Sequence, residues 1–225
     1  MSDVESTALQ TPDDSEVASA ARKRPKPGER RAQILQALAS MLEQPGAERI
    51  TTAALAARLE VSEAALYRHF ASKAQMFEGL IEFIEQTVFS LINQIVQRER
   101  LADASEVNSD AGAGLRQVGQ VVAMLMQFAE KNPGLSRVMV GDALVFENER
   151  LQQRMNQFFD KIESTFKQSL RPAAQVSGSA TPTVDAQVRA SVIAAFVVGR
   201  LQRFTRSNFK RSPSEHLEAS LAYLL

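Results

Sequence analysis

The sequence contains no cysteine, which excludes disulfide bonds, thiolate metal ligands and a cysteine nucleophile. It has only two histidines, His69 and His216, too few for a histidine-rich metal site. The longest apolar run, 190–199, has ten residues, whereas a membrane-spanning helix needs about 20. The N-terminus lacks the basic start and apolar stretch of a signal peptide. We therefore predict a soluble cytoplasmic protein without a membrane span.

Motifs for nucleotide binding and catalysis are also missing. Neither G-x-x-x-x-G-K nor G-x-G-x-x-G occurs, so a nucleotide would lack its usual phosphate cradle. No nucleophile, metal cluster or paired carboxylate lies near His69 in the sequence, and we expect His69 to pack or to meet a phosphate. His216 is interpreted as a surface or interface residue. We predict a binding protein without a cofactor, not an enzyme.

The balanced total charge, 26 basic and 26 acidic residues, hides a local asymmetry. Residues 1–20 carry five acids and no base, whereas residues 21–31 carry six bases and one acid. We predict that residues 1–27 form a disordered acidic tail followed by a basic arm. Such an arm suits a polyanion such as DNA, although a solvated terminus explains the same composition.

Helical periodicity covers most of the chain, and no segment alternates like a strand. With 44% hydrophobic residues, 225 residues are enough to bury a substantial core. We predict an all-α protein with loops at 103–114 and 172–182. The expected helices are 34–42 (ended by Pro45-Gly46), 51–59, 62–69, 72–95, 115–129, a short helix to about 141, 151–170, 184–204 and a last helix with Ser212 as N-cap, Pro213 at N1 and Glu215 at N3.

The two short helices 51–59 and 62–69 have the spacing of a helix-turn-helix. The second helix of such a pair enters the major groove with its N-terminal residues at base edges. Thr51, Ser62 and Ser72 are the predicted N-caps, the last in a Ser-x-x-Gln capping box with Gln75, and capped helix starts offer backbone N–H groups to phosphates. A plain three-helix bundle, in which Tyr67, His69 and Phe70 merely pack, is the alternative. The predicted DNA-binding residues are Thr51, Ser62, Glu63, Ala64, Ala65, Tyr67, His69 and Lys73, with the arm bases Arg22, Lys23 and Arg24 at phosphates.

Residues 50–73 resemble the DNA-binding domain of TetR-type regulators, most specifically in the ending Leu-Tyr-Arg-His-Phe…Ser-Lys. The resemblance implies a helix-turn-helix domain at 28–74, a helical dimerisation and partner-binding domain at 75–225, and a homodimer on palindromic double-stranded DNA. We expect the last two helices to form the dimer interface and Val197→Glu to yield monomers. Glu60 stands where the family commonly has glycine, and a non-glycine residue at positive φ costs about 1 kcal/mol.

Four further segments, 77–85, 130–135, 141–147 and 203–213, resemble one branch of these regulators, the SlmA family of nucleoid occlusion factors. Members associate with the nucleoid and, when DNA-bound, antagonise assembly of FtsZ, the tubulin-like division GTPase, so that the septum does not form over the chromosome. The resemblance implies a partner-binding patch that contains Phe83, Lys131 and Asn132. Phe83 equally suits the rim of a core stripe, and Gln127 and Leu91 depart from the family pattern.

A ligand-responsive transcriptional repressor on the same fold is the alternative function. Methionine and phenylalanine side chains suit an adaptable small-molecule pocket, but at helical spacing they equally suit a plain core. The residues in question are Met124, Met126, Phe128, Met139, Phe146, Met155 and Phe158.

Overall fold

The computed structural model describes residues 28–44, 50–103 and 110–225, all of whose regular structure is helical. This confirms the predicted all-α fold. The predicted acidic tail, the arm bases and the Pro45-Gly46 stop lie outside the described residues. The helices are α1 (Glu29–Leu42), α2 (Thr52–Arg58), α3 (Glu63–Tyr67), α4 (Lys73–Asp103), α5 (Asp110–Lys131), α6 (Pro133–Met139), the short 3₁₀ helix η2 (Asp142–Leu144), α7 (Glu149–Val176), α8 (Pro182–Arg206) and α9 (Leu217–Leu224).

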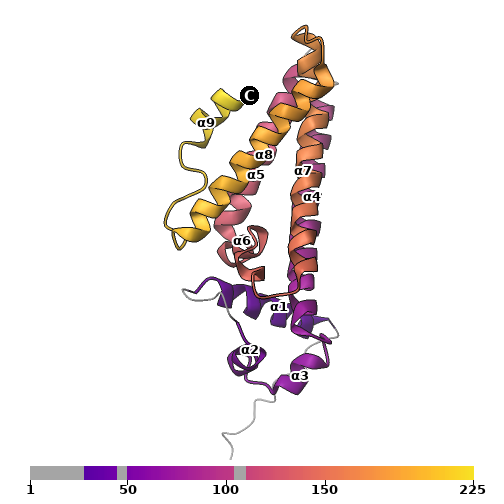
Figure 1. Ribbon diagram of the computed structural model, residues 1–225. Helices are drawn as coiled ribbons and strands as arrows, with labels where there is room; N and C mark the ends of the chain where they lie inside the picture. The colour runs from indigo at the N-terminus through magenta and orange to yellow at the C-terminus, as the bar shows by residue number, and fades with distance from the viewer. Residues whose placement is uncertain (1–27, 45–49, 104–109) are drawn as a thin grey trace, which may run out of the picture.

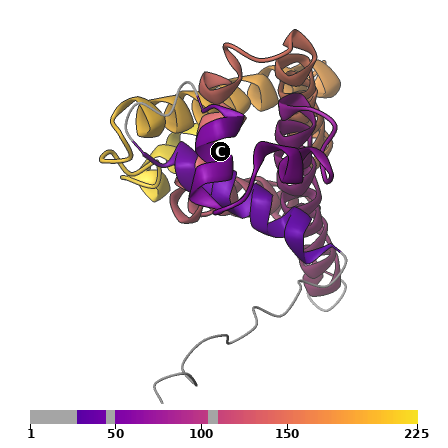
Figure 2. The same ribbon diagram turned by 90° about the horizontal axis from the view of Figure 1, so that it is seen from below.

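The three N-terminal helices occupy one end of the molecule, and the long helices α4, α5, α7 and α8 run side by side away from it (Figure 1). Seen from the N-terminal end, α1 to α3 overlie the ends of these long helices (Figure 2). Helix α4 starts beside α3 and continues through the C-terminal layer, so one rigid element serves both parts. In the described ranges, no helix is both long and apolar enough to cross a membrane.

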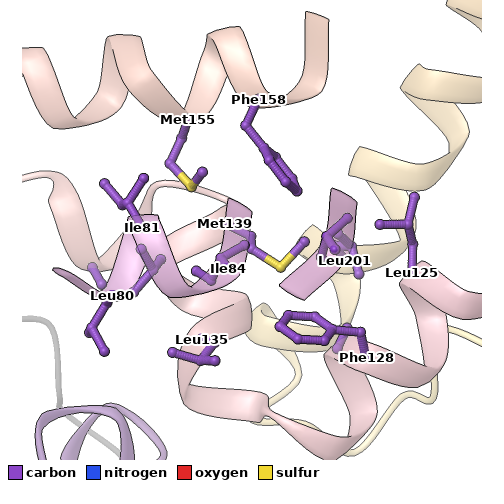
Figure 3. Close-up of a cluster of buried hydrophobic side chains, with 14 of the residues drawn as sticks. Leu80, Ile81, Ile84, Leu125, Phe128, Leu135, Met139, Met155, Phe158 and Leu201 are labelled. Carbon is purple, nitrogen blue, oxygen red and sulfur yellow. The ribbon is translucent and has the colours of Figure 1, made fainter. Parts of the chain in front are cut away.

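The core is a cluster of apolar side chains between α4, α5, α6, α7 and α8 (Figure 3). Most of the methionine and phenylalanine side chains considered for a ligand pocket belong to this cluster, including Met126, Met139 and Phe158, all at most 2% exposed. Phe146 is the exception, with 65% of its surface exposed. The core interpretation of these residues therefore fits the structure better than an internal pocket.

Local capping chemistry sets the helix starts around the helix-turn-helix as predicted. Thr51 Oγ1 accepts a hydrogen bond from the amide of Ala54 (3.1 Å), and Ser62 Oγ accepts one from Ala65 (3.3 Å). Ser72 Oγ accepts one from Gln75 (3.2 Å). The side chain of Gln75 reaches back to the amide of Ala71, one residue earlier than in a regular capping box.

Pro172 does not end α7. The loop predicted at 172–182 is wrong for residues 172–176, which are helical. Helix α7 continues through Pro172 to Val176. A proline inside a helix costs about 3 kcal/mol because it removes a hydrogen bond and crowds the preceding turn. The helix is already fixed by its buried face, which ends at Leu170, and alanines favour one further turn after the proline.

The predicted loop at 103–114 is also too long, because α5 begins at Asp110. Gly114 lies within this helix, and a Cβ atom at its position would stand 1.9 Å from the backbone oxygen of Ser169 in α7. The glycine therefore allows a close approach of two helices. In the sequence, a glycine after a run of residues without helical periodicity is typical of a flexible loop, which explains why the predicted loop extended to residue 114.

The last helix starts at Leu217, not after Ser212. Ser212 Oγ hydrogen-bonds the carboxylate of Glu130 and also accepts from the amide of Ser214 (3.2 Å). These contacts hold a turn against the end of α5 instead of starting a helix. His216 then adopts φ 52°, which separates this turn from α9.

Candidate nucleic-acid interface and partner groove

Helices α2 and α3 form a helix-turn-helix whose turn contains a strained residue. Glu60 has φ 53°, in the left-handed region that glycine prefers. The turn is closed by hydrogen bonds from Glu60 N to Ala57 O (3.1 Å) and from Val61 N to Ala56 O (3.0 Å). The departure from glycine at this position therefore leaves the turn intact, at a cost of about 1 kcal/mol.

The predicted base-contacting residues stand at the accessible N-terminal end of α3. Ser62, Glu63 and Ala64 are exposed and Ala65 is half-buried. Thr51 at the start of α2 and His69 after α3 are also exposed, and Tyr67 is 45% exposed.

Burial separates the packing residues of α3 from those left free to meet a ligand. Leu66 and Phe70 are each 1% exposed and anchor the helix to the domain core. Of Tyr67, His69 and Phe70, only Phe70 therefore packs as the plain-bundle alternative requires. Arg31 of α1 braces the end of α3, because its guanidinium donates to His69 O (2.9 Å) and stacks 4.2 Å from the Phe70 ring.

Thr52 is a residue that the sequence reasoning missed. Its hydroxyl donates to the carboxylate of Glu63 (2.6 Å) and accepts a long hydrogen bond from the Tyr67 hydroxyl (3.5 Å). The threonine therefore joins α2 to α3 and orients a carboxylate at the start of the candidate recognition helix. A carboxylate at this place can accept a hydrogen bond from cytosine N4. No sequence pattern shows this link, since the partners are 11 residues apart.

Lys73, predicted to contact phosphate, forms an ion pair with Glu147, which lies just before α7. The side chain of Lys73 is 28% exposed, so the lysine is half-buried at the first position of α4. The sequence gives no indication of this partner, which lies 74 residues away. The site thus has a direct connection to the C-terminal helices.

A groove lies at the junction of α1, α4 and α6, and two of the three predicted partner-binding residues line it. It has a volume of about 520 Å³, and Phe83 and Asn132 form parts of its wall. Phe83 is 49% exposed, as expected for a residue at the edge of the core stripe of α4. Helix α1, which the sequence reasoning did not include, contributes polar residues to the opposite side. The other lining residues are Ala32, Leu35, Gln36, Ala39, Ser40, Glu43, Leu80 and Leu135.

Lys131 ends α5 and Asn132 follows it as the N-cap of α6, beside this groove. Lys131 is exposed. The Asn132 amide donates to the backbone oxygen of Phe128 (2.8 Å), which holds its side chain in place. In the described parts of the chain, no group of three or more His, Asp or Glu side chains is arranged to hold a metal ion. The exposed start of α3 and the groove at Phe83 suit macromolecular contacts at two neighbouring surfaces.

An exposed apolar stripe follows one face of α8. Val184, Val188 and Val192 are 58%, 58% and 52% exposed, and helical spacing places Gln202 in line with Val184, whereas Val198 lies toward the edge of this face. Val198 and Gln202 line a groove of about 640 Å³ against α7, with Met139 and Met155 as part of its floor. Three large aliphatic side chains exposed in one row indicate a surface that a partner covers.

Comparison with known proteins identifies both parts of the chain. Residues 34–80 match the family model described as bacterial regulatory proteins of the tetR family, and residues 113–225 match the SlmA-like model described as tetracyclin repressor-like, C-terminal domain. Solved structures with the same fold include the regulators FadR from Bacillus subtilis, in complex with stearoyl-CoA, and FadR from Bacillus halodurans. Their TM-scores are 0.62 and 0.64 at 16% and 14% identity, over 86% and 89% of this chain and 96% of each of theirs.

Much closer sequence relatives are curated nucleoid occlusion factors named SlmA. Those of Aliivibrio fischeri and Vibrio vulnificus are each 48% identical, over 89% and 88% of this chain and 96% and 95% of their own length. That of Vibrio cholerae is 48% identical over 87% of this chain and 93% of its own. The chain belongs to the SlmA family of nucleoid occlusion factors, a branch of the TetR-type regulators.

Proposed function

We propose that this protein is a nucleoid occlusion factor that binds palindromic DNA as a dimer and, when DNA-bound, antagonises FtsZ polymer assembly over the chromosome. Family membership supports this function. The observation that carries it is the exposed groove at Phe83, which lies beside the helix-turn-helix domain and shares α1 with it. A ligand-responsive repressor would need its methionines and phenylalanines around an internal cavity, but most of them fill the core.

The apolar stripe of α8 supports the proposed dimer. Two copies that bury Val184, Val188 and Val192 against each other would also place two recognition helices on one DNA face, about 34–36 Å apart. Val197, chosen from the sequence as the interface residue, is fully buried inside the protomer. Leu217, Leu221 and Leu224 of α9 contact the core of the same protomer but are only half-buried, and no residue of α9 is buried. The proposed dimer surface is therefore the exposed face of α8, together with the side of α9 that the protomer leaves uncovered.

DNA affinity should divide into contacts that position the protein and contacts that specify sequence. Lys73→Ala should weaken binding to every sequence and reduce the slope of log K against log salt by about 1, because one phosphate contact is lost. Ala64→Leu should mainly reduce discrimination, because its bulk pushes α3 out of the groove. Fluorescence anisotropy with a duplex selected from a random pool, and with an unrelated duplex of equal length, measures both effects. Equal losses of specific and non-specific affinity in both variants would contradict this division.

Partner binding should be separable from DNA binding. Phe83→Ala combined with Lys131→Glu removes the aromatic wall of the groove and reverses the adjacent charge. The proposed occupant is the C-terminal tail of FtsZ, acidic with apolar residues, so this double variant should lose tail binding and no longer block polymer assembly. Light scattering of FtsZ assembly with and without the selected duplex, together with anisotropy for DNA, provides the readouts.

The control for this experiment is an exposed pair away from the groove, Val176→Ala with Arg171→Glu on α7. This control should behave as the wild type in both assays. If the Phe83 and Lys131 variant binds the tail as well as the wild type, the groove is not the partner site. If the wild-type protein never affects FtsZ assembly, the repressor alternative becomes the better interpretation.

A further inference from the structure

One ion pair joins the start of α4 in the DNA-binding part to the turn just before α7 in the C-terminal part. The ammonium group of Lys73 donates to the Glu147 carboxylate. The Glu147 side chain is 11% exposed, and that of Lys73 is 28% exposed. The ammonium also lies 5.7 Å from the ring centre of the buried Phe77. The carboxylate is therefore largely covered, whereas the lysine keeps an open side.

Two ion pairs of the described residues join α4 to α7, and in both the positions of cation and acid are reversed. Arg150 pairs with Glu78, and Arg154 pairs with Glu85, so in both the cation comes from α7 and the acid from α4. Of these three ion pairs, Lys73–Glu147 alone has its cation in the DNA-binding part. It is also the pair at the end of α4 that adjoins α3.

We propose that Glu147 and the DNA phosphates compete for the Lys73 ammonium, so that Glu147 is a positioning residue that opposes DNA binding. The inference rests on the proposed phosphate contact of Lys73. A lysine ammonium is a compact charge on a flexible stem and can turn from one anion to another. While Lys73 is paired with Glu147 its charge is largely neutralised, so a phosphate gains the attraction of this lysine only by displacing the carboxylate. DNA binding therefore draws Lys73 away from its internal partner.

This competition has a consequence for the turn between η2 and α7. Once Lys73 has moved to a phosphate, the Glu147 carboxylate is still largely buried but has lost this positively charged partner. A buried charge without its partner is unfavourable. Residues 142–148 should then open more readily to solvent than in free protein. The turn carries the exposed residues Val145 and Phe146. DNA binding would therefore change how these apolar side chains are positioned on the surface of the C-terminal part.

Glu147→Gln tests the competition, because glutamine keeps the size and an acceptor oxygen but removes the charge. We expect its affinity for both the selected and the unrelated duplex to be about three- to tenfold tighter than that of the wild type, the size of one partly solvated charge interaction. In a Lys73→Ala background the same substitution should leave affinity unchanged. The matched control is Glu78→Gln, which breaks a neighbouring α4–α7 pair whose cation lies on α7 and should not tighten binding.

Unchanged or weaker DNA binding by Glu147→Gln would overturn the proposal, and so would a gain that persists without Lys73. Hydrogen exchange of the wild-type protein gives an independent readout that does not depend on a variant folding. Amides of 142–148 should exchange faster with DNA bound, and equal or slower exchange would also refute the proposal. Failure of the proposed DNA-binding function gives a different result, since then neither wild type nor Glu147→Gln binds either duplex.

Discussion

Val188→Glu should convert the protein from a dimer to a monomer and lower its affinity for a palindromic duplex by about 10²- to 10⁴-fold. The side chain of Val188 is 58% exposed in the free protomer, so the substitution leaves the protomer core unchanged. In a dimer it would place two carboxylates in an apolar interface without partners, which is strongly unfavourable. A monomer then engages one half-site and loses the advantage of the linked second site.

Sedimentation velocity at micromolar concentration measures the oligomeric state, and anisotropy measures DNA affinity. Val176→Glu is the control, because Val176 is also an exposed valine, 73% exposed, but stands at the end of α7. This control should remain dimeric. A dimer that survives Val188→Glu, or a native protein that is already monomeric, would rule out the α8 surface.

Gly134→Ala should destabilise the protein by about 1–3 kcal/mol, because it forces apart two helices that touch through their backbones. A Cβ atom at Gly134 in α6 would stand 2.0 Å from the backbone oxygen of Ala39 in α1. Backbone atoms cannot rotate away as a side-chain end can, so α1 or α6 must move. The free energy of unfolding, measured by urea denaturation, should fall accordingly.

Gly119→Ala in α5 is the matched control for this substitution. Its added methyl group would stand 3.4 Å from a terminal carbon of Leu225, an ordinary contact with a flexible side chain. Alanine also favours a helix over glycine by about 1 kcal/mol, so the control should keep or raise stability. If Gly134→Ala unfolds at the wild-type midpoint, the close approach of α1 and α6 does not constrain the fold.

Features governed by neighbouring residues could be predicted from the sequence. The caps of Thr51, Ser62 and Ser72 depend on a side chain and an amide three residues away, and all three are confirmed. The errors at Pro172, Gly114 and Ser212 share one cause. Each residue type commonly ends or starts a helix, but here tertiary contacts with another helix or a buried helical face outweigh that local preference.

In the site, too, features set by neighbouring residues could be predicted, whereas contacts between distant segments could not. The exposed start of α3 and the exposure of Phe83 follow from helical spacing. The Thr52–Glu63 hydrogen bond, the contribution of α1 to the groove and the pairing of Lys73 with Glu147 depend on how distant segments pack. Sequence periodicity shows which face of a helix is free, but not what another helix places against it.

The length of α4 makes it a lever. At about 1.5 Å per residue, its 31 residues extend for roughly 46 Å from the DNA-binding end. If that helix tilts by about 5° around Lys73, its far end is displaced by about 4 Å, while Phe83, roughly 15 Å along it, is displaced by about 1 Å. Glu99 near the far end is hydrogen-bonded to Arg116 and Gln120 of α5. A small rotation of the helix-turn-helix on its duplex would therefore produce a larger displacement where α4 contacts α5.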